Sequence, residues 1–136
     1  DTLQKVRMSV FIFVTEKGMI KQVEGAEFDV AKRTIAATKL LDGDKVVSIA
    51  ALGEAQTCVF RTHQGMCLRI AISEIPQKKK AAIGVRGMKL DGEDRIEEVY
   101  YPDSEKDKMI YYKEKEVHLD KLKIAGRDTK GTRIRV

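Results

Sequence analysis

An internal repeat of about 47 residues constrains the fold of this chain more than any other feature. The stretch "FIFVTEKGMIKQV" (residues 11–23) aligns with "CVFRTHQGMCLRI" (residues 58–70), and the glycines at positions 18 and 65 are 47 positions apart. Each stretch contains an apolar segment, a polar turn, a Gly-Met pair and a second apolar segment. Because a unit of this size cannot bury its apolar face alone, neighbouring units have to stack on one another.

The segments that follow these stretches also repeat. "AEFDVAKRTIAATKLLDGDKV" (residues 26–46) aligns with "SEIPQKKKAAIGVRGMKLDGEDRI" (residues 73–96), and both contain a basic cluster, small residues and an Asp-Gly turn. A third, shorter unit turns at residues 113–116 without a glycine, which predicts a hairpin of a different shape. We expect one domain over residues 1–136, with blades at about 8–52 and 57–102 and an incomplete blade at 108–136.

The segments between the turns have the composition of β-strands. They are short and rich in Val, Ile, Phe, Tyr and Thr, and Gly18 and Gly65 stand where a hairpin needs a positive φ. Residues 35–41 are the nearest candidate for a helix, but Ile35 and Thr38 are β-branched. Closed propellers need about four to eight blades. The sequence therefore predicts an all-β fold, a β-propeller or β-pinwheel fragment of about three four-stranded blades in an open array.

The charge and the cysteines indicate the class of partner and the compartment. The chain has 136 residues and a net charge of +5, which favours a polyanionic partner. It has no apolar run long enough to span a bilayer, and its start at Asp1 indicates a piece of a larger protein. Cys58 and Cys67 lie in strand-like segments and have no ligand spacing, so we expect buried free thiols in a reducing cytosol.

The same segment of each repeat is basic, whereas acids concentrate elsewhere, as in residues 103–107. A merely solvated face would accept charges of either sign, so this recurrence favours a role in binding. In a row of blades, equivalent segments lie on one side and would form a positive strip that binds duplex phosphates without reading bases. The candidate DNA-binding residues are Lys32, Arg33, Lys39, Lys78, Lys79, Lys80, Arg86, Lys89, Lys121, Lys123, Arg127, Lys130 and Arg133.

Glycines punctuate these basic segments, and we interpret them as positions where backbone amides approach phosphates closely. They are Gly84, Gly87, Gly126 and Gly131. No aromatic residues alternate with the lysines, which disfavours a stacking platform for single strands.

Nothing in the sequence marks a catalytic centre. His63 and His118 have no second histidine or carboxylate at ligand spacing, and no glycine-rich phosphate loop precedes a helix. We therefore expect no catalytic residue, no metal site and no cofactor on this chain.

Three segments carry a resemblance to a known family. "SEIPQKKKAAIGVRGMKL" and "KEVHLDKLKIAGRDTKGTRIRV" are similar to late repeats of the C-terminal domain of the A subunit of bacterial type IIA DNA topoisomerases, and "EGAEFDVAKRTIAATKL" resembles an earlier repeat. The topoisomerase IV A subunit of Gram-positive bacteria is the most similar, and the gyrase A subunit is the close alternative.

The resemblance implies a β-pinwheel, in which neighbouring blades exchange strands and a basic perimeter bends the double-stranded DNA to be transported. It implies a non-catalytic part of an ATP-dependent enzyme, whose ATP and Mg²⁺ are bound by other domains. The implied partners are duplex DNA, the ATPase B subunit, and the remainder of the A subunit. The implied location is the bacterial cytoplasm, at the nucleoid.

The gyrase A subunit carries a Gln-Arg-Arg-Gly-Gly-Lys-Gly box that the family needs for chiral wrapping of DNA. The matching positions are residues 32–38, 77–84 and 126–131, and none holds the intact box. Residues 126–131 are nearest, with Asp128 and Thr129 in place of the central glycines. This departure favours topoisomerase IV.

Two other hypotheses remain open from the residues. A protein-interaction propeller fragment would use the tops of its blades, and its basic face would be incidental. A protein that binds anionic membranes would need exposed apolar residues beside the lysines, and residues 81–83 offer little apolar surface.

Overall fold

Two Gly-Met hairpins form the centre of the fold, and they are built alike. The computed structural model describes residues 10–24, 40–78 and 82–134. The candidate residues that lie outside the described residues are Lys32, Arg33, Lys39, Lys79 and Lys80. Most of the possible helix at 35–41 also lies outside them.

The first hairpin joins β1 (Val10–Thr15) to β2 (Met19–Glu24), and the second joins β4 (Thr57–Thr62) to β5 (Met66–Ala71). Gly18 and Gly65 have φ angles of 88° and 89°, as the repeat predicts. The threonine hydroxyl that ends the first strand of each hairpin accepts a hydrogen bond from the backbone amide after the glycine, at 3.1 Å in one and 3.0 Å in the other.

A third strand is added on the side of β1 and β4. β3 (Val46–Ala51) pairs antiparallel with β1, and β7 (Ile96–Tyr100) pairs antiparallel with β4. A buried aspartate precedes each of these strands and accepts a hydrogen bond from a backbone amide in the hairpin turn. Asp44 accepts from Lys17 at 2.9 Å, and Asp94 accepts from Gln64 at 3.0 Å.

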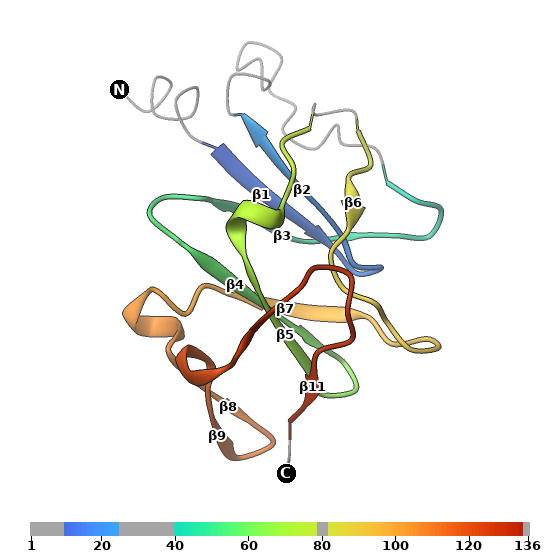
Figure 1. The fold of residues 1–136 in the computed structure, drawn as a ribbon. Helices are drawn as coiled ribbons and strands as arrows, with labels where there is room; N and C mark the ends of the chain where they lie inside the picture. Colours follow the sequence, from blue (N-terminus) through green and yellow to red (C-terminus); the bar gives the residue numbers. More distant parts are fainter. Residues whose placement is uncertain (1–9, 25–39, 79–81, 135–136) are drawn as a thin grey trace.

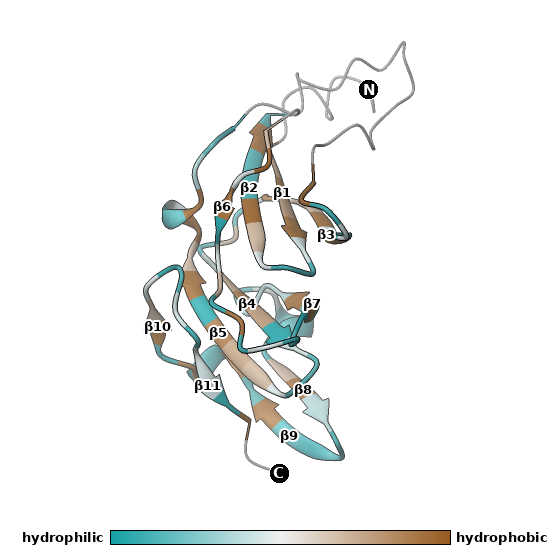
Figure 2. Cartoon of the chain, turned by 90° about the vertical axis from the view of Figure 1, so that its right-hand side faces the viewer, coloured by the Kyte–Doolittle hydropathy of each residue, from teal (hydrophilic) through white to brown (hydrophobic). Residues whose placement is uncertain are grey.

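The outer strand of each sheet comes from the following repeat. β6 (Val85–Arg86) belongs to the second repeat but pairs with β2, which gives the first sheet the order β3-β1-β2-β6. β10 (Ile124–Ala125) and β11 (Thr132–Arg133) belong to the third repeat and pair with β5 in the second sheet, whose order is β10-β5-β4-β7. Figure 2 shows β6, β10 and β11 on one side of the molecule and β3 and β7 on the other. This exchange is the arrangement that a pinwheel requires.

The third repeat contributes a two-stranded sheet of β8 (Met109–Tyr112) and β9 (Lys115–His118), at the lower end of the molecule in Figure 1. Lys113 and Glu114 form its turn with φ angles of 50° and 68°, the backbone of a type I′ hairpin. The expected difference in turn shape is therefore confirmed.

Among the described residues the helical elements are 3₁₀ turns, and there is no α-helix. They are η3 (Ile72–Glu74), η4 (Glu105–Asp107) and η5 (Leu119–Lys121). The prediction of an all-β chain is confirmed.

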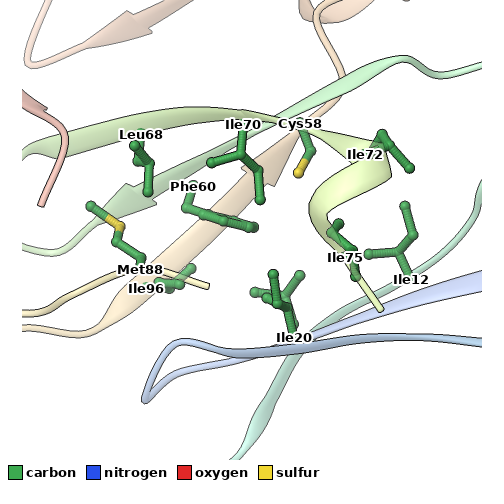
Figure 3. Packing of buried hydrophobic residues seen from close by; sticks show 11 residues of the cluster. Ile12, Ile20, Cys58, Phe60, Leu68, Ile70, Ile72, Ile75, Met88 and Ile96 are labelled. Carbon is green, nitrogen blue, oxygen red and sulfur yellow. The ribbon is translucent and has the colours of Figure 1, made fainter. Parts of the chain in front are cut away.

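The main core lies between the two large sheets. Ile12 and Ile20 of the first sheet pack with Phe60 and Ile70 of the second, and each is at most 1% exposed (Figure 3). A smaller cluster around Leu119 joins the second sheet to the β8–β9 hairpin. Full burial of an apolar side chain of this size contributes about 1.5–3 kcal/mol, so the sheets stabilise one another through these contacts.

Candidate nucleic-acid interface

Residues 76–78 and 82–88 follow the outer edge of β2, and residues 123–134 follow that of β5 in the same way. In the first sheet the backbone amide of Lys78 donates to the carbonyl of Gln22 at 2.8 Å, and the chain then returns antiparallel so that Arg86 pairs with Met19. In the second sheet, β10 runs parallel to β5 and β11 returns antiparallel, so that Arg133 pairs with Met66. We call these two stretches the outer segments.

Close packing explains three of the four glycines in the outer segments. Gly84 has a φ of 99°, and a Cβ there would lie 2.5 Å from the carbonyl oxygen of Ile20. Gly131 has a φ of 75°, and its Cβ would lie 2.1 Å from the carbonyl oxygen of Cys67. A Cβ at Gly87 would lie 2.6 Å from the side chain of Ile20. Packing against the edge strand therefore already requires glycine at these three positions, and the interpretation that they admit phosphate stays a prediction.

Gly126 differs, because a Cβ there would meet no atom within 4 Å. The interpretation that a glycine permits close approach of a ligand stays a prediction for this position.

The described candidate cations lie on the outer segments or on the elements next to them. Arg86 and Arg133 are on β6 and β11, while Lys121 is the last residue of η5. Arg127 is half-buried, and the others are exposed: Lys78, Arg86, Lys89, Lys121, Lys123, Lys130 and Arg133.

The two outer segments contact each other directly. The backbone amide of Asp128 donates to the carbonyl of Gly87 at 2.9 Å, and the amide of Lys89 donates to the carbonyl of Thr129 at 2.9 Å. The Arg127 guanidinium also donates to the carbonyl of Arg86 at 2.8 Å. Basic residues of the second and third repeats are thus brought together around residues 86–89 and 126–130.

Two of these cations have carboxylate partners on the opposite segment or turn. Arg86 Nε lies 2.6 Å from Asp128 Oδ1, and Lys130 Nζ lies 2.9 Å from Asp91 Oδ1. Four other candidates form no ion pair within the described ranges, namely Lys78, Lys89, Lys121 and Lys123. Arg133 is directed toward the β4–β5 turn, where its guanidinium donates to the carbonyl of Gln64 at 3.0 Å.

A charged cluster at the β4–β7 edge was not predicted from the sequence. His63 Nδ1 lies 2.6 Å and Arg61 Nη1 lies 3.1 Å from the Glu97 carboxylate. Hydrogen bonds from His63 and then Arg61 lower the pKa of Glu97 against the opposing effect of burial. Glu97 is more than 30 positions from Arg61 and His63 in sequence, and only the pairing of β4 with β7 could have revealed their contact. The cluster ties the two strands together.

Lys21 is a second basic residue that the sequence pattern did not single out. It is 2% exposed, its ammonium donates to the carbonyl of Ala82 at 2.6 Å, and it lies 5.2 Å from the centroid of the Phe13 ring. Burial lowers its pKa. Its position inside the first sheet makes it a structural residue rather than a surface contact for DNA.

Within the described ranges, no three His, Cys, Asp or Glu residues are grouped so that they could hold a metal ion. None of the helical elements described is long and apolar enough to cross a membrane.

The repeats match a known family of propeller domains. The family model described as the DNA gyrase C-terminal domain, beta-propeller, matches residues 10–52 and 57–100. The gyrase A protein of Kosmotoga olearia is 34% identical over 96 residues, which cover 68% of this chain and 12% of that protein. The DNA topoisomerase 4 A protein of Staphylococcus aureus is 28% identical over 88 residues, which cover 63% of this chain and 11% of that protein. The chain therefore spans only a small part of the length of these two relatives.

Solved structures give the same result at the level of the fold. A C-terminal domain of DNA topoisomerase IV superposes with a TM-score of 0.78 at 25% identity, over 93% of this chain and 41% of that one. The C-terminal domain of E. coli ParC superposes with a TM-score of 0.74 at 17% identity, over 95% of this chain and 57% of that one. The predicted propeller or pinwheel fragment is confirmed.

The paired outer segments, the shared core and the two matched repeats therefore lead to one assignment: the chain belongs to the DNA gyrase C-terminal domain family of β-propellers, which is part of the A subunits of type IIA topoisomerases.

Proposed function

We propose that this chain is a non-catalytic duplex-binding domain that bends DNA along its outer segments and presents it for transport. The observation that supports the proposal is the direct contact between the outer segments, which gathers basic residues of two repeats around residues 86–89 and 126–130. Each cation that neutralises a phosphate releases counterions, and this attraction is independent of base sequence.

Bending follows from the spread of the cations over successive sheets. Smooth bending of a site of about 20–30 base pairs costs about 1–6 kcal/mol, and a single cluster would offset little of that cost. Contacts on a second sheet are made only when the duplex follows the outer segments from one sheet to the next. The bent duplex is then the state with the most phosphate contacts.

The parent protein, in this proposal, is an ATP-dependent type IIA topoisomerase. ATP and Mg²⁺ belong to its other domains, and the partners of this chain are the ATPase B subunit, together with the remainder of the A subunit. Asp128 and Thr129, which stand where the gyrase box has glycines, favour topoisomerase IV over gyrase.

Binding of a random-sequence duplex, titrated against salt, tests the proposal. If about four to six phosphates are neutralised, log K falls with log salt at a slope of about −4 to −5, since each phosphate contributes about −0.9. Joint replacement of Lys78, Lys79 and Lys80 by Ala should weaken binding equally across sequences and flatten that slope.

The matched control is the joint Ala replacement of Lys45, Lys106 and Lys115, which removes the same charge from exposed positions outside the outer segments. It should change the slope much less. Equal effects of the two triple variants would show that only net charge matters. Co-sedimentation with anionic vesicles but no duplex binding would favour the membrane hypothesis instead.

A further inference from the structure

An acidic residue of the third repeat holds a candidate DNA-binding arginine of the second. Two distances define the contact: Arg86 Nε lies 2.6 Å from Asp128 Oδ1, and Arg86 Nη2 donates to Asp128 Oδ2 at 3.3 Å. The guanidinium thus forms an ion pair with the carboxylate in which one contact, from Nη2 to Oδ2, is a hydrogen bond. A guanidinium can bind a phosphate through the same nitrogens. The two ligands need the same face of Arg86.

The backbone around Asp128 fixes the carboxylate in this place. Its amide donates to the carbonyl of Gly87, and its φ of 63° lies in the left-handed region. The side chain of Thr129 donates to the carbonyl of Gly126 at 2.8 Å, which closes the loop from within. Asp128 is thus held opposite Arg86 by the main chain of both outer segments.

The ion pair is accessible to a ligand. The side chain of Arg86 is 58% exposed and that of Asp128 is 37% exposed. Exposed ion pairs contribute little net stability, so a phosphate can compete for the guanidinium. The pair of Lys130 with Asp91 is similar, with side chains 53% and 60% exposed.

We propose that Asp128 is a positioning residue that competes with DNA phosphate for Arg86. The inference rests on the proposed function. In the free protein the carboxylate neutralises the arginine and links the outer segments; a duplex has to displace it to gain that contact. Asp128 therefore makes duplex binding weaker and less dependent on salt than the number of cations implies, and Asp91 acts in the same way on Lys130.

Replacement of Asp128 by Asn tests the proposal, because Asn also tolerates a positive φ and nearly preserves the side-chain shape. One additional phosphate contact should steepen the salt slope by about 0.9 and tighten binding up to about eightfold at about 0.1 M salt. In an Arg86→Gln background the same replacement should have no such effect. Asp91→Asn is a second, independent variant, whose effect should disappear in a Lys130→Gln background.

Glu93→Gln is the matched control, since it removes one negative charge from an exposed residue of the same turn as Asp91. If it tightens binding as much as Asp128→Asn does, or if Arg86→Gln leaves the effect of Asp128→Asn intact, the inference is wrong and net charge explains the change.

A measurement without DNA separates this inference from the proposed function. Proton exchange at Arg86 Nε, followed by NMR, should be faster in Asp128→Asn than in the wild type. Equal exchange rates would show that Asp128 does not hold Arg86 in solution, which would overturn this inference but leave the proposed function standing. A wild-type chain that binds no duplex would overturn the proposed function and, with it, the competition.

Discussion

The α-carbon of Gly84 lies against the carbonyl oxygen of Ile20, so that a Cβ on Gly84 would be only 2.5 Å from that oxygen. The same relationship recurs in the second sheet between Gly131 and Cys67, at 2.1 Å. Both glycines also have a positive φ. An outer segment can therefore pack this closely against its edge strand only because the residue at the point of contact is a glycine.

Replacement of Gly84 by Ala should reduce the free energy of unfolding by about 1–3 kcal/mol, because the residue is strained in φ and its Cβ meets main chain. Gly131→Ala should have a similar or larger effect. Urea unfolding followed by circular dichroism measures the change.

Two glycines serve as controls for the Gly84 prediction. Gly126 has no neighbour within 4 Å of a Cβ and no positive φ, and Gly92 has a φ of 54° but no such neighbour either. Gly126→Ala should leave the free energy of unfolding nearly unchanged. Gly92→Ala should lower it only by the strain of placing a side chain on a residue with a positive φ. A loss at Gly92 as large as that at Gly84 would mean that the contact with Ile20 is unimportant.

The two cysteines should be unreactive in the folded protein. Burial raises the pKa of Cys58 to about 12, and it raises that of Cys67 to about 11, from an ordinary value of 9.0. The thiolate is the reactive form, so labelling with a disulfide reagent at pH 8 should proceed only through unfolding and accelerate with urea. Labelling at a rate independent of urea would contradict the buried positions.

The same pKa values predict a loss of stability at alkaline pH. The folded state keeps its thiol protons above pH 9, where the unfolded state loses them, so the stabilisation is complete below about pH 9 and declines as the pH rises toward 11 and 12. Each thiol lowers the free energy of unfolding by up to about 1.4 kcal/mol per pH unit in that window. A variant with both cysteines replaced by Ala should show a shallower decline in urea titrations.

The hydrogen bonds of Asp103 lead us to expect that the stability of the fold falls at acid pH. Burial alone would raise its pKa, but hydrogen bonds from the backbone amides of Gln56 and Thr57, both 2.9 Å long, lower it below 3.8. Its stabilisation is therefore present above about pH 4 and is lost as the pH falls further.

Asp103→Asn should lower the free energy of unfolding at pH 7 by about 0.5–1 kcal/mol, a small value because the carboxylate is exposed. The difference from the wild type should shrink at pH 3. Glu105→Gln is a control on the same loop, where the carboxylate pairs with Lys108 at 2.9 Å. A difference that stays constant between pH 7 and pH 3 would assign the effect to shape rather than charge.

The bound chain should bend DNA without wrapping it chirally. Ligation of a nicked circle in its presence, followed by removal of protein and a topoisomer gel, should give a distribution centred where the protein-free control lies. Without the intact box at residues 126–131, nothing is expected to hold the duplex around a ring. A shift toward positive linking-number change that grows with protein would indicate gyrase-like wrapping.

The hairpins could be predicted because their signals are local. Gly18 and Gly65 fix the turns, and β-branched and aromatic residues surround them. Strand exchange is not a local property, since β6 is indistinguishable in sequence from a strand that stays within its own repeat. The resemblance to the family implied it, and the pairing of β6 with β2 confirmed it.

The candidate interface was predicted only in part. Exposure of the described lysines follows from their long charged side chains, but the ion pair of Arg86 with Asp128 joins residues 42 positions apart. In the sequence, Asp128 stands out only because it replaces a glycine of the gyrase box. Its effect on Arg86 depends on how the outer segments meet, which no local pattern specifies.

Strand exchange also affects the order in which the protein can fold during synthesis. β1 and β2 emerge from the ribosome early, but the outer edge of β2 gains its described partners only when residues 76–78 and then β6, at residues 85–86, have emerged. An unpaired strand edge is a site of aggregation. Because synthesis proceeds from the N-terminus, the first repeat emerges before the segment that covers its edge. Each repeat therefore protects the one before it, and a chain arrested within the second repeat would expose the edge of β2 to any other nascent strand nearby.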